Sequence, residues 1–229
     1  NQIQVDYGRE LFYAGDFVVR KGDWITLDGG TGEVMEGKVA MLAPKTDAGA
    51  MATLLSWADD VARLKVRANA DTGSDAAKAR QLGATGIGLC RTEHMFLAPD
   101  RLPVVREMIL ADTPADEDKA LAELGRVQQI DFEEILLAMD GLPVTVRLLD
   151  PPLHEFLPSA EELRLKKATK GLTKTETAEL KAAEEWAEHN PMIGTRGVRL
   201  GVVKPGLYAM QVRALMAAAA ALRKKGKNP

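Results

Sequence analysis

The chain has 229 residues, of which 46% are hydrophobic and 28% are charged, and its formal net charge at pH 7 is -3. These values are typical of globular proteins, and they exclude a collagen-like, a low-complexity and a disulfide-rich chain. The slight excess of acid argues against nucleic acid as a partner. The longest apolar stretch, residues 215–222, is far shorter than the about 20 residues that cross a membrane.

The first 45 residues predict a small β unit. Runs rich in β-branched and aromatic residues alternate with turn sequences, which is typical of antiparallel hairpins. The runs span residues 5–12, 17–19, 24–27 and 33–35. The glycine-rich segment 29–32 is either a phosphate-binding loop or a hairpin turn. Because it lacks the lysine and hydroxyl that end a P-loop, the turn is favoured. So short a unit buries too little apolar surface to be stable alone.

After a linker at residues 44–50, strand and helix patterns alternate. We predict strands over 64–69, 86–90 and 143–149, and helices over 54–62, 76–82, 104–110, 117–139, 161–165, 174–188, 198–203 and 207–223. Ser74 and Asp75 are the expected cap of the helix over 76–82, and Gly83 ends that helix. The alternation predicts an α/β fold in which helices cover a parallel sheet.

Three parallel strands are too few to close a barrel. A complete (β/α)8 barrel of the TIM type needs about 250 residues, and an open sheet of three strands leaves two unprotected edges. We therefore expect an incomplete (β/α)8 barrel, with a turn at 224–229 that leads toward a further strand. The start at Asn1, without methionine or a secretory leader, also predicts a piece of a longer protein.

The first motif is the sequence GIGLCRTEHMF over residues 86–96, in which polar residues follow a predicted strand. Ligands of parallel α/β folds bind at this end of the strands. Arg91 has a fixed charge and a planar fork that suits phosphate or carboxylate, and we expect Glu93 to hold it in place. The alternative is a surface salt bridge. Cys90, the single cysteine, is expected to be a buried thiol, and it favours a reducing, cytoplasmic compartment.

The second motif is TVRLLDPPLHEF over residues 145–156, where Arg147 interrupts an apolar strand. A charge at such a position is costly unless it is paired or directed at an anion. One interpretation is a structural pair with Asp150 or Glu155. The other is an anion site shared with Arg91, because both arginines end successive parallel strands.

The third motif is NPMIGTRGVRL over residues 190–200. Arg196 and Arg199 are three residues apart and are expected on one face of a helix, where solvated arginines are the favoured interpretation. The histidines are too scattered for a metal site, and each is expected to form hydrogen bonds in a loop. They are His94, His154 and His189.

Taken together, the three motifs closely resemble the pyruvate, phosphate dikinase family of phosphoenolpyruvate (PEP)-utilising enzymes. The segments KVRANAD (65–71) and GDWITLDGGTGEV (22–34) resemble that family too, so the resemblance covers essentially the whole chain. The segment DPPLHEF (150–156) distinguishes the dikinases from PEP synthase and from enzyme I of the sugar phosphotransferase system. The resemblance implies a phosphotransferase that interconverts ATP, phosphate and pyruvate with AMP, pyrophosphate and PEP.

The resemblance also implies a domain organisation and a set of binding residues. Residues 1–45 match the C-terminal end of a swivelling phosphohistidine domain, residues 46–63 a linker and helix, and residues 64–229 the first part of the PEP/pyruvate-binding barrel. Arg91 and Arg147 match the arginines that grip the phosphoryl group and the carboxylate side of the substrate. Arg196 matches a position close to them.

Several functional groups of the family are expected outside this chain. The resemblance places there the phosphohistidine, the nucleotide-binding region, the Mg2+ ligands, the substrate asparagine and the proton-donating cysteine, which is not Cys90. Residues 187–189 depart from the family's histidine-glutamate-phenylalanine, which weakens a role for His189. We therefore expect the isolated chain to be inactive, because activity depends on the missing remainder of the enzyme. We expect the full-length enzyme to be a homodimer. The alternatives are a non-catalytic half-barrel interaction module and an enzyme I-like segment.

Overall fold

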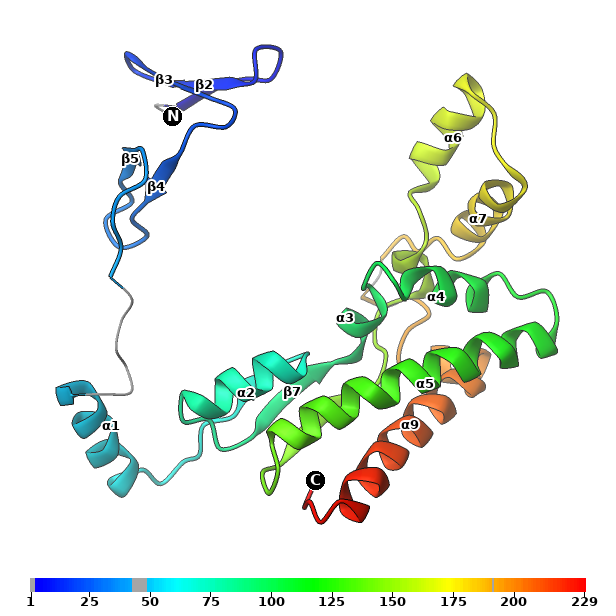
Figure 1. Ribbon diagram of the computed structural model, residues 1–229. Coiled ribbons are helices and arrows are strands. Elements are labelled where there is room, and N and C mark those ends of the chain that lie inside the picture. The colour runs from blue at the N-terminus through cyan, green and yellow to red at the C-terminus, as the bar shows by residue number, and fades with distance from the viewer. Residues whose placement is uncertain (1–2, 43–48, 191) are drawn as a thin grey trace. The chain divides into compact units, whose positions relative to one another are not determined.

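A computed structural model describes residues 3–42, 49–190 and 192–229 (Figure 1). Most of the predicted linker over 44–50 lies outside the described residues, and so does Pro191 of the third motif. The chain divides into two compact units, Asn1–Ser56 and Trp57–Pro229, which we call the N-terminal and the C-terminal unit.

The described part of the N-terminal unit contains two small antiparallel sheets. The first sheet has the order β1-β2-β3, and the second pairs β4 with β5. The strands are β1 (Ile3–Asp6), β2 (Leu11–Ala14), β3 (Phe17–Arg20), β4 (Ile25–Leu27) and β5 (Val34–Glu36). The predicted single strand over 5–12 is wrong, because a turn separates β1 from β2.

The turn between β4 and β5 confirms the hairpin interpretation of the glycine-rich segment. The Asp28 carboxylate accepts hydrogen bonds from the backbone N–H groups of Gly30 at 2.8 Å and Thr31 at 3.2 Å. These bonds hold the pKa of Asp28 below its ordinary value. Aspartate at such a position stabilises a turn by replacing a backbone hydrogen bond. The Asp28 side chain therefore takes the backbone N–H groups of Gly30 and Thr31 that a phosphate-binding loop would offer to phosphate.

The C-terminal unit is built around a parallel sheet of order β6-β7-β8. Its strands are β6 (Ala68–Asn69), β7 (Ile87–Arg91) and β8 (Val144–Arg147). The predicted parallel arrangement is confirmed, although only the last two residues of the predicted strand over 64–69 pair with β7. A Cβ atom at Gly86 would lie 2.8 Å from the carbonyl oxygen of Pro143, so this glycine permits the close approach of the two chain segments.

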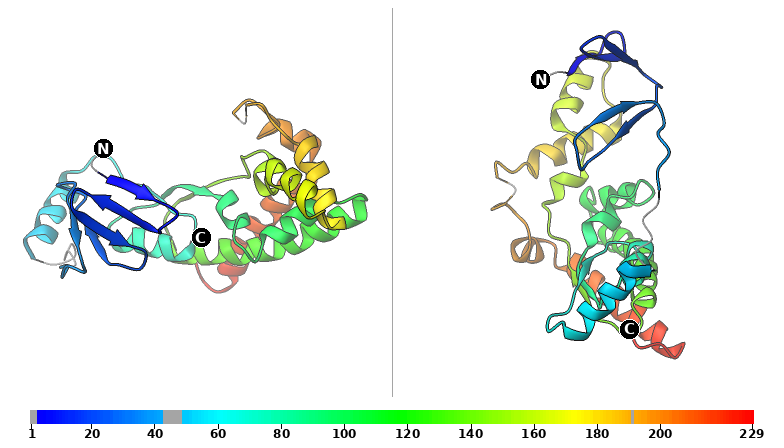
Figure 2. Two further views of the ribbon diagram at one scale, coloured as in Figure 1. Left: turned by 90° about the horizontal axis from the view of Figure 1, so that it is seen from above. Right: turned by 90° about the vertical axis from the view of Figure 1, so that its left-hand side faces the viewer.

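Helices α2, α5 and α9 pack against this sheet, and α5 and α9 lie side by side (Figures 1 and 2). The helices of the described C-terminal part are α2 (Gly73–Gln81), α3 (Thr92–Phe96), α4 (Leu102–Ile109), α5 (Pro114–Ala138), the 3-10 helix η1 (Leu153–Phe156), α6 (Ala160–Thr169), α7 (Lys174–Glu185), α8 (Val198–Val203) and α9 (Pro205–Lys224), while α1 (Gly49–Val61) crosses the division between the units. These assignments establish the α/β class.

The helix boundaries follow capping chemistry. Thr72 caps α2 by accepting a hydrogen bond from the Asp75 backbone N–H at 3.1 Å, so the predicted cap at Ser74 and Asp75 is displaced by two residues. Thr113 caps α5 in the same way, with Pro114 at the first helical position. Thr173 and Glu176 form a reciprocal capping box at α7.

Among the described residues of the C-terminal unit, two hydrophobic clusters form the core. One lies where α4, α5, η1 and α9 meet and contains Phe96, Leu124 and Phe156. The other joins the sheet to α5 and α9 and contains Ile87, Cys90 and Phe132, all nearly inaccessible. Because α5 contributes to both clusters, this long helix connects the two halves of the core.

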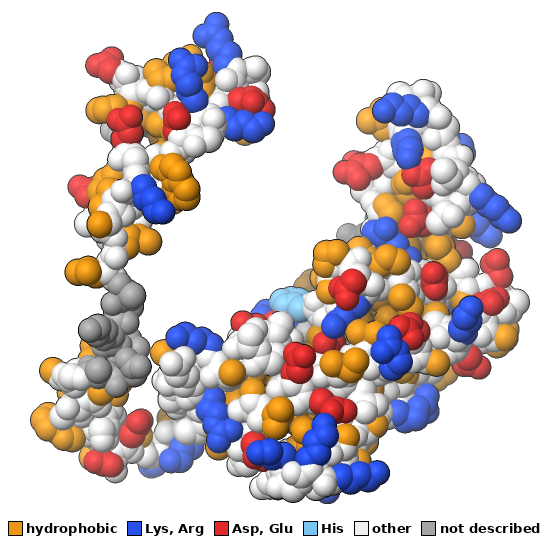
Figure 3. Space-filling model, viewed as in Figure 1, with side chains coloured by type: hydrophobic (Ala, Val, Ile, Leu, Met, Phe, Trp, Pro, Cys, Tyr) orange, Lys and Arg blue, Asp and Glu red, His pale blue; other side chains and the backbone are white. Residues whose placement is uncertain are grey.

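On the face of the C-terminal unit that Figure 3 draws, charged side chains of both signs are mixed, with lysine and arginine interspersed with aspartate and glutamate. Among the described residues, no helix has the length and the apolar character that a membrane span requires.

Candidate functional site

The carboxyl ends of β7 and β8 bring the two predicted arginines together. In the parallel ladder Arg91 lies directly opposite Arg147. Both residues end their strands, so both stand at the edge of the sheet where parallel α/β folds bind ligands. The predicted adjacency is therefore confirmed, while the ligand of the two arginines stays a prediction.

Asp71, which follows β6, holds Arg91. Its carboxylate accepts hydrogen bonds from the Arg91 backbone N–H at 2.7 Å, from Nε at 3.1 Å and from Nη2 at 2.8 Å. His94 adds a contact from Nδ1 to Oδ2 at 2.8 Å. Burial tends to raise the pKa of Asp71, but the hydrogen bonds from Arg91 outweigh it and the pKa lies below its ordinary value. The same hydrogen bonds raise the pKa of Arg91.

Glu93 holds Arg147, so the expectation that it holds Arg91 is wrong. The Nη2 group of Arg147 donates a hydrogen bond to Glu93 Oε1, and Nη1 lies 3.4 Å from Asp150 Oδ2. The Glu93 side chain is only 7% exposed. Glu93 Oε2 and Arg147 Nε are both buried without a hydrogen-bond partner among the described residues. Of the two structural pairs considered for Arg147, the one with Asp150 is thus present.

Arg196 reaches the same edge through Asp150. Its Nε lies 3.2 Å from Asp150 Oδ1, and its Nη2 donates to Oδ2. The hydrogen bond to this carboxylate raises the pKa of Arg196. The expected helical face shared with Arg199 is wrong, because Gly197 takes a φ of 54° and α8 begins only after it. Arg196 therefore belongs to the preceding turn, where it can turn toward β8.

Two residues of α9, Gln211 and Tyr208, form hydrogen bonds to the chain just past the ends of β7 and β8. Neither residue was predicted from the sequence to belong to the site. The Gln211 side chain donates to Thr92 Oγ1 at 3.0 Å and accepts from the Leu149 backbone N–H at 2.9 Å. Tyr208, one helical turn earlier, donates its hydroxyl to the Leu149 carbonyl at 2.6 Å. Burial raises the pKa of Tyr208, and the nearby Asp150 charge adds to that. One feature of the sequence could have indicated this role: Gln211 is a polar residue on the apolar face of the helix predicted over 207–223.

In this site three arginine side chains form ion pairs with three carboxylates. Each carboxylate fixes the orientation of a guanidinium group, which otherwise has many rotamers. The anion-binding capacity depends on N–H groups that the carboxylates leave unbonded. Arg91 is the best placed, since Asp71 takes its Nε and Nη2 and leaves Nη1 without a partner among the described residues. The arrangement suits a small anion that competes with, or adds to, these carboxylates.

The side chains of Cys90, His154 and His189, which were also considered from the sequence, are not among the hydrogen-bond partners described for the three arginines. Cys90 is fully buried, and burial together with the neighbouring Asp71 charge raises its pKa to about 12, which confirms an unreactive buried thiol. His154 lies in η1, and its Nδ1 is buried without a hydrogen-bond partner among the described residues, while His189 is exposed. Since His94 also lies in a helix, α3, the expectation that each histidine forms hydrogen bonds in a loop is wrong. In the parts of the chain that the structure describes, no three His, Cys, Asp or Glu residues are arranged to hold a metal ion.

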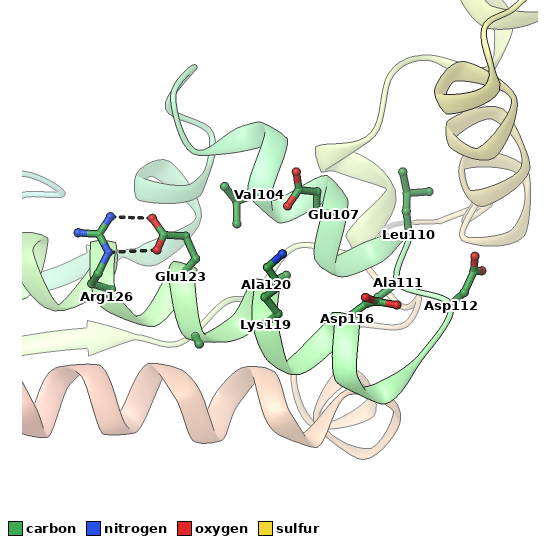
Figure 4. A pocket seen from close by; sticks show the side chains of 11 residues that line it. Val104, Glu107, Leu110, Ala111, Asp112, Asp116, Lys119, Ala120, Glu123 and Arg126 are labelled. Carbon is green, nitrogen blue, oxygen red and sulfur yellow. Dashed lines mark hydrogen bonds and ion pairs between the residues drawn. The ribbon is translucent and has the colours of Figure 1, made fainter.

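A separate open pocket of about 840 Å³ lies between α4 and α5 (Figure 4). Glu107 of α4 and Lys119 of α5 line it, and the dashed lines in Figure 4 join Arg126 to Glu123 within α5. None of the three edge arginines lines this pocket. Because this pocket is open and is lined by both acidic and basic side chains, we do not take it as a second candidate site.

Comparison with known proteins places these observations in a family. Residues 45–226 match the family model described as "PEP-utilising enzyme, PEP-binding domain". The chain is 48% identical over 231 residues to pyruvate, phosphate dikinase of Entamoeba histolytica, which covers 98% of this chain and 26% of the relative.

Two further relatives are also named as pyruvate, phosphate dikinases. The chloroplastic pyruvate, phosphate dikinase of Flaveria pringlei is 50% identical over 226 residues, covering 98% of this chain and 24% of the relative. The pyruvate, phosphate dikinase of Rhizobium meliloti is 48% identical over 218 residues, covering 95% of this chain and 24% of the relative. The chain thus spans about a quarter of the length of these curated relatives.

Proposed function

Because this chain belongs to the PEP-utilising enzymes, we propose that it is the segment of a pyruvate, phosphate dikinase that holds PEP or pyruvate. The whole enzyme then interconverts ATP, phosphate and pyruvate with AMP, pyrophosphate and PEP. The observation that carries the proposal is the pairing of Arg91 with Arg147 at the carboxyl edge of β7 and β8. Arg196 supports it, because Asp150 joins this arginine to Arg147.

The proposed role of the arginines follows from their charge and geometry. PEP carries a phosphate and a carboxylate on a three-carbon frame, so it presents two anionic groups at a short distance. Two guanidinium groups that end neighbouring strands match such a pair of anions. Arginine keeps its charge at every physiological pH, and a charge held in place before the reaction stabilises a moving phosphoryl group most effectively. Arg91 and Arg147 therefore bind and orient the substrate.

Asp71 and Glu93 act on the arginines in this proposal. Each accepts hydrogen bonds from one guanidinium group and fixes it before substrate arrives. Less rotamer freedom is then lost on binding, so more of the interaction free energy contributes to affinity. The unbonded N–H group of Arg91 is the donor directed at the anion.

The remaining parts of the proposal lie beyond this segment. We propose that residues 64–229 form the first part of a (β/α)8 barrel and that residues 1–45 end a phosphohistidine domain, as the resemblance implies. Bound Mg2+ would stabilise the enolate oxygen and the phosphate, and the rest of the longer enzyme supplies its ligands. That longer enzyme is proposed to be a cytoplasmic homodimer.

Replacing the arginines in the longer enzyme tests the proposal. We expect Arg91→Met and Arg147→Met each to lower kcat/KM for PEP by about 100-fold or more, since removing one preorganised donor commonly costs that much. Arg126→Met, which removes an exposed arginine of α5, is the matched control and should leave kcat/KM unchanged. Unchanged kcat/KM in both edge variants would contradict the proposal.

The isolated 229-residue chain provides a second test. We expect it to form no pyruvate from PEP, AMP and pyrophosphate, because the proposed phosphohistidine and metal ligands belong to the rest of the enzyme. Measurable turnover by the purified chain would overturn this part of the proposal.

A further inference from the structure

A buried chain of hydrogen bonds links α9 to the ends of both arginine-bearing strands. Gln211 donates to Thr92 Oγ1 at 3.0 Å, and Thr92 Oγ1 donates to the carbonyl oxygen of Arg147 at 3.0 Å. Gln211 Oε1 accepts from the Leu149 backbone N–H at 2.9 Å. Gln211 and Thr92 are both fully buried. Thr92 directly follows Arg91, so these bonds bridge β7 and β8 where the ladder ends.

A second contact of α9 extends this bridge to the turn that carries Arg196. The Tyr208 hydroxyl donates to the Leu149 carbonyl at 2.6 Å and also lies 3.1 Å from the Gly197 carbonyl. Tyr208 and Gln211 are three residues apart and therefore share a face of α9. One helix thus holds the backbone beside all three edge arginines.

The chemistry of Gln211 argues for a specific purpose. Its neighbours on the buried face of α9, Leu207, Met210 and Ala214, are apolar, and a buried amide is unfavourable unless its donor and acceptor are both satisfied. Here each end of the amide has a partner just past the end of a different strand, Thr92 after β7 and Leu149 after β8. An apolar residue of equal size would fill the same space, but it would leave the relative position of the two strand ends less well defined.

From these contacts we infer that Gln211 and Thr92 are positioning residues that set the spacing of Arg91 and Arg147 for the two anionic groups of the substrate. The inference rests on the proposed function, because it presumes that the two arginines bind PEP. A displacement of about 1 Å at a binding group can cost as much as 100-fold in rate. Loss of the bridge should therefore weaken PEP binding although neither residue contacts PEP.

The test uses four variants of the longer enzyme, measured beside the Arg91→Met and Arg147→Met enzymes of the proposed function. Gln211→Met and Thr92→Val keep the size of each side chain and remove its hydrogen bonds, while Thr92→Ser keeps the hydroxyl. Gln129→Met is the matched control, because Gln129 bonds only to Glu133 of the same helix α5 among the described residues. For each variant we would measure KM for PEP, KM for AMP, kcat and thermal unfolding.

We expect Gln211→Met and Thr92→Val to raise KM for PEP about tenfold or more and to leave KM for AMP unchanged. Thr92→Ser should restore KM for PEP to within about twofold of the wild type, and Gln129→Met should not change it. A role in stability alone would lower the active fraction, and hence kcat, without moving KM for PEP. That result would overturn the inference.

Two outcomes separate this inference from the proposed function. If Arg147→Met raises KM for PEP but Gln211→Met and Thr92→Val do not, the bridge has no positioning role and the proposed function stands. If Arg91→Met and Arg147→Met both leave kcat/KM for PEP unchanged as well, the proposed function fails first. Should Gln211→Met not fold, the contrast between Thr92→Val and Thr92→Ser decides the question.

Discussion

The two units of the chain use hydrophobic residues in opposite ways. In the C-terminal unit, Phe96, Phe132 and Phe156 are at most 2% exposed. In the N-terminal unit, Phe17, Trp24 and Leu27 are each 66% exposed. Leu11 is the buried hydrophobic residue of the N-terminal unit among those that the structure describes.

The difference shows that apolar content alone does not make a core. Short two- and three-stranded sheets offer one face each and bury little area, whereas α5 covers a sheet and also packs against α9. The N-terminal strands are thus specified locally by their turns, and the C-terminal unit by long-range packing. Stability measurements on the two units should differ accordingly.

The largest expected contrast is in thiol reactivity. Cys90 is fully buried with a pKa raised to about 12, so it should react only when the C-terminal unit opens. We expect Ellman's reagent to label the folded chain at least about 1,000-fold more slowly than the denatured chain. A cysteine introduced as Val18→Cys in β3, at a position that is 44% exposed, should react at nearly the denatured rate. Equal labelling rates at the two positions would refute the contrast.

The next contrast is between two phenylalanines. Phe132→Ala should lower the free energy of unfolding of the C-terminal unit by about 3–5 kcal/mol, because it leaves a cavity beneath α5. Phe17→Ala should change stability by no more than about 0.5 kcal/mol, because that side chain is mostly solvated. Urea unfolding followed by circular dichroism measures both. A larger loss for Phe17→Ala than for Phe132→Ala would reverse our description of the units.

A smaller contrast concerns two ion pairs. Lys204 lies 2.6 Å from Glu117 at the start of α9, and its side chain is only 15% exposed. We expect Lys204→Ala to cost about 1.5 kcal/mol, since hydrogen bonds to charged groups are strong when water is partly excluded. The pair of Lys21 with Glu10 is mostly exposed, so Lys21→Ala should change stability by no more than about 0.5 kcal/mol. The same urea unfolding experiment compares them, and equal costs would argue against the difference in burial.

The smallest contrast appears only in acid. The pKa of Asp71 lies below its ordinary value of 3.8, so its stabilising contribution is complete above about pH 3.8 and is lost as the pH falls through the folded value. Asp71→Asn should therefore flatten the acid limb of a stability profile measured by thermal unfolding. Asp28→Asn, in an exposed turn, serves as the comparison in the N-terminal unit. An unaltered acid limb in Asp71→Asn would show that Arg91 does not stabilise this carboxylate.

Local patterns in the sequence predicted the parts of the molecule that depend on local physics. The three parallel strands, the long helices and the hairpin at Asp28 follow from hydrophobic periodicity and from turn residues. The predictions failed where one residue decides the local backbone. Examples are the cap at Thr72 and the turn at Gly197, whose φ of 54° separates Arg196 from α8.

The sequence by itself predicted that Arg91 and Arg147 lie on successive parallel strands toward the same edge, because strands joined by helical crossovers run in one direction. That β8 ends at Arg147, two residues before the predicted end of the strand, is seen only in the structure. Only the tertiary structure decided which carboxylate holds which arginine. Asp71 takes Arg91 and Glu93 takes Arg147, because the register of β6, β7 and β8 sets these distances. Gln211 likewise reaches the edge only through the packing of α9, since it lies 119 positions after Thr92 in the sequence.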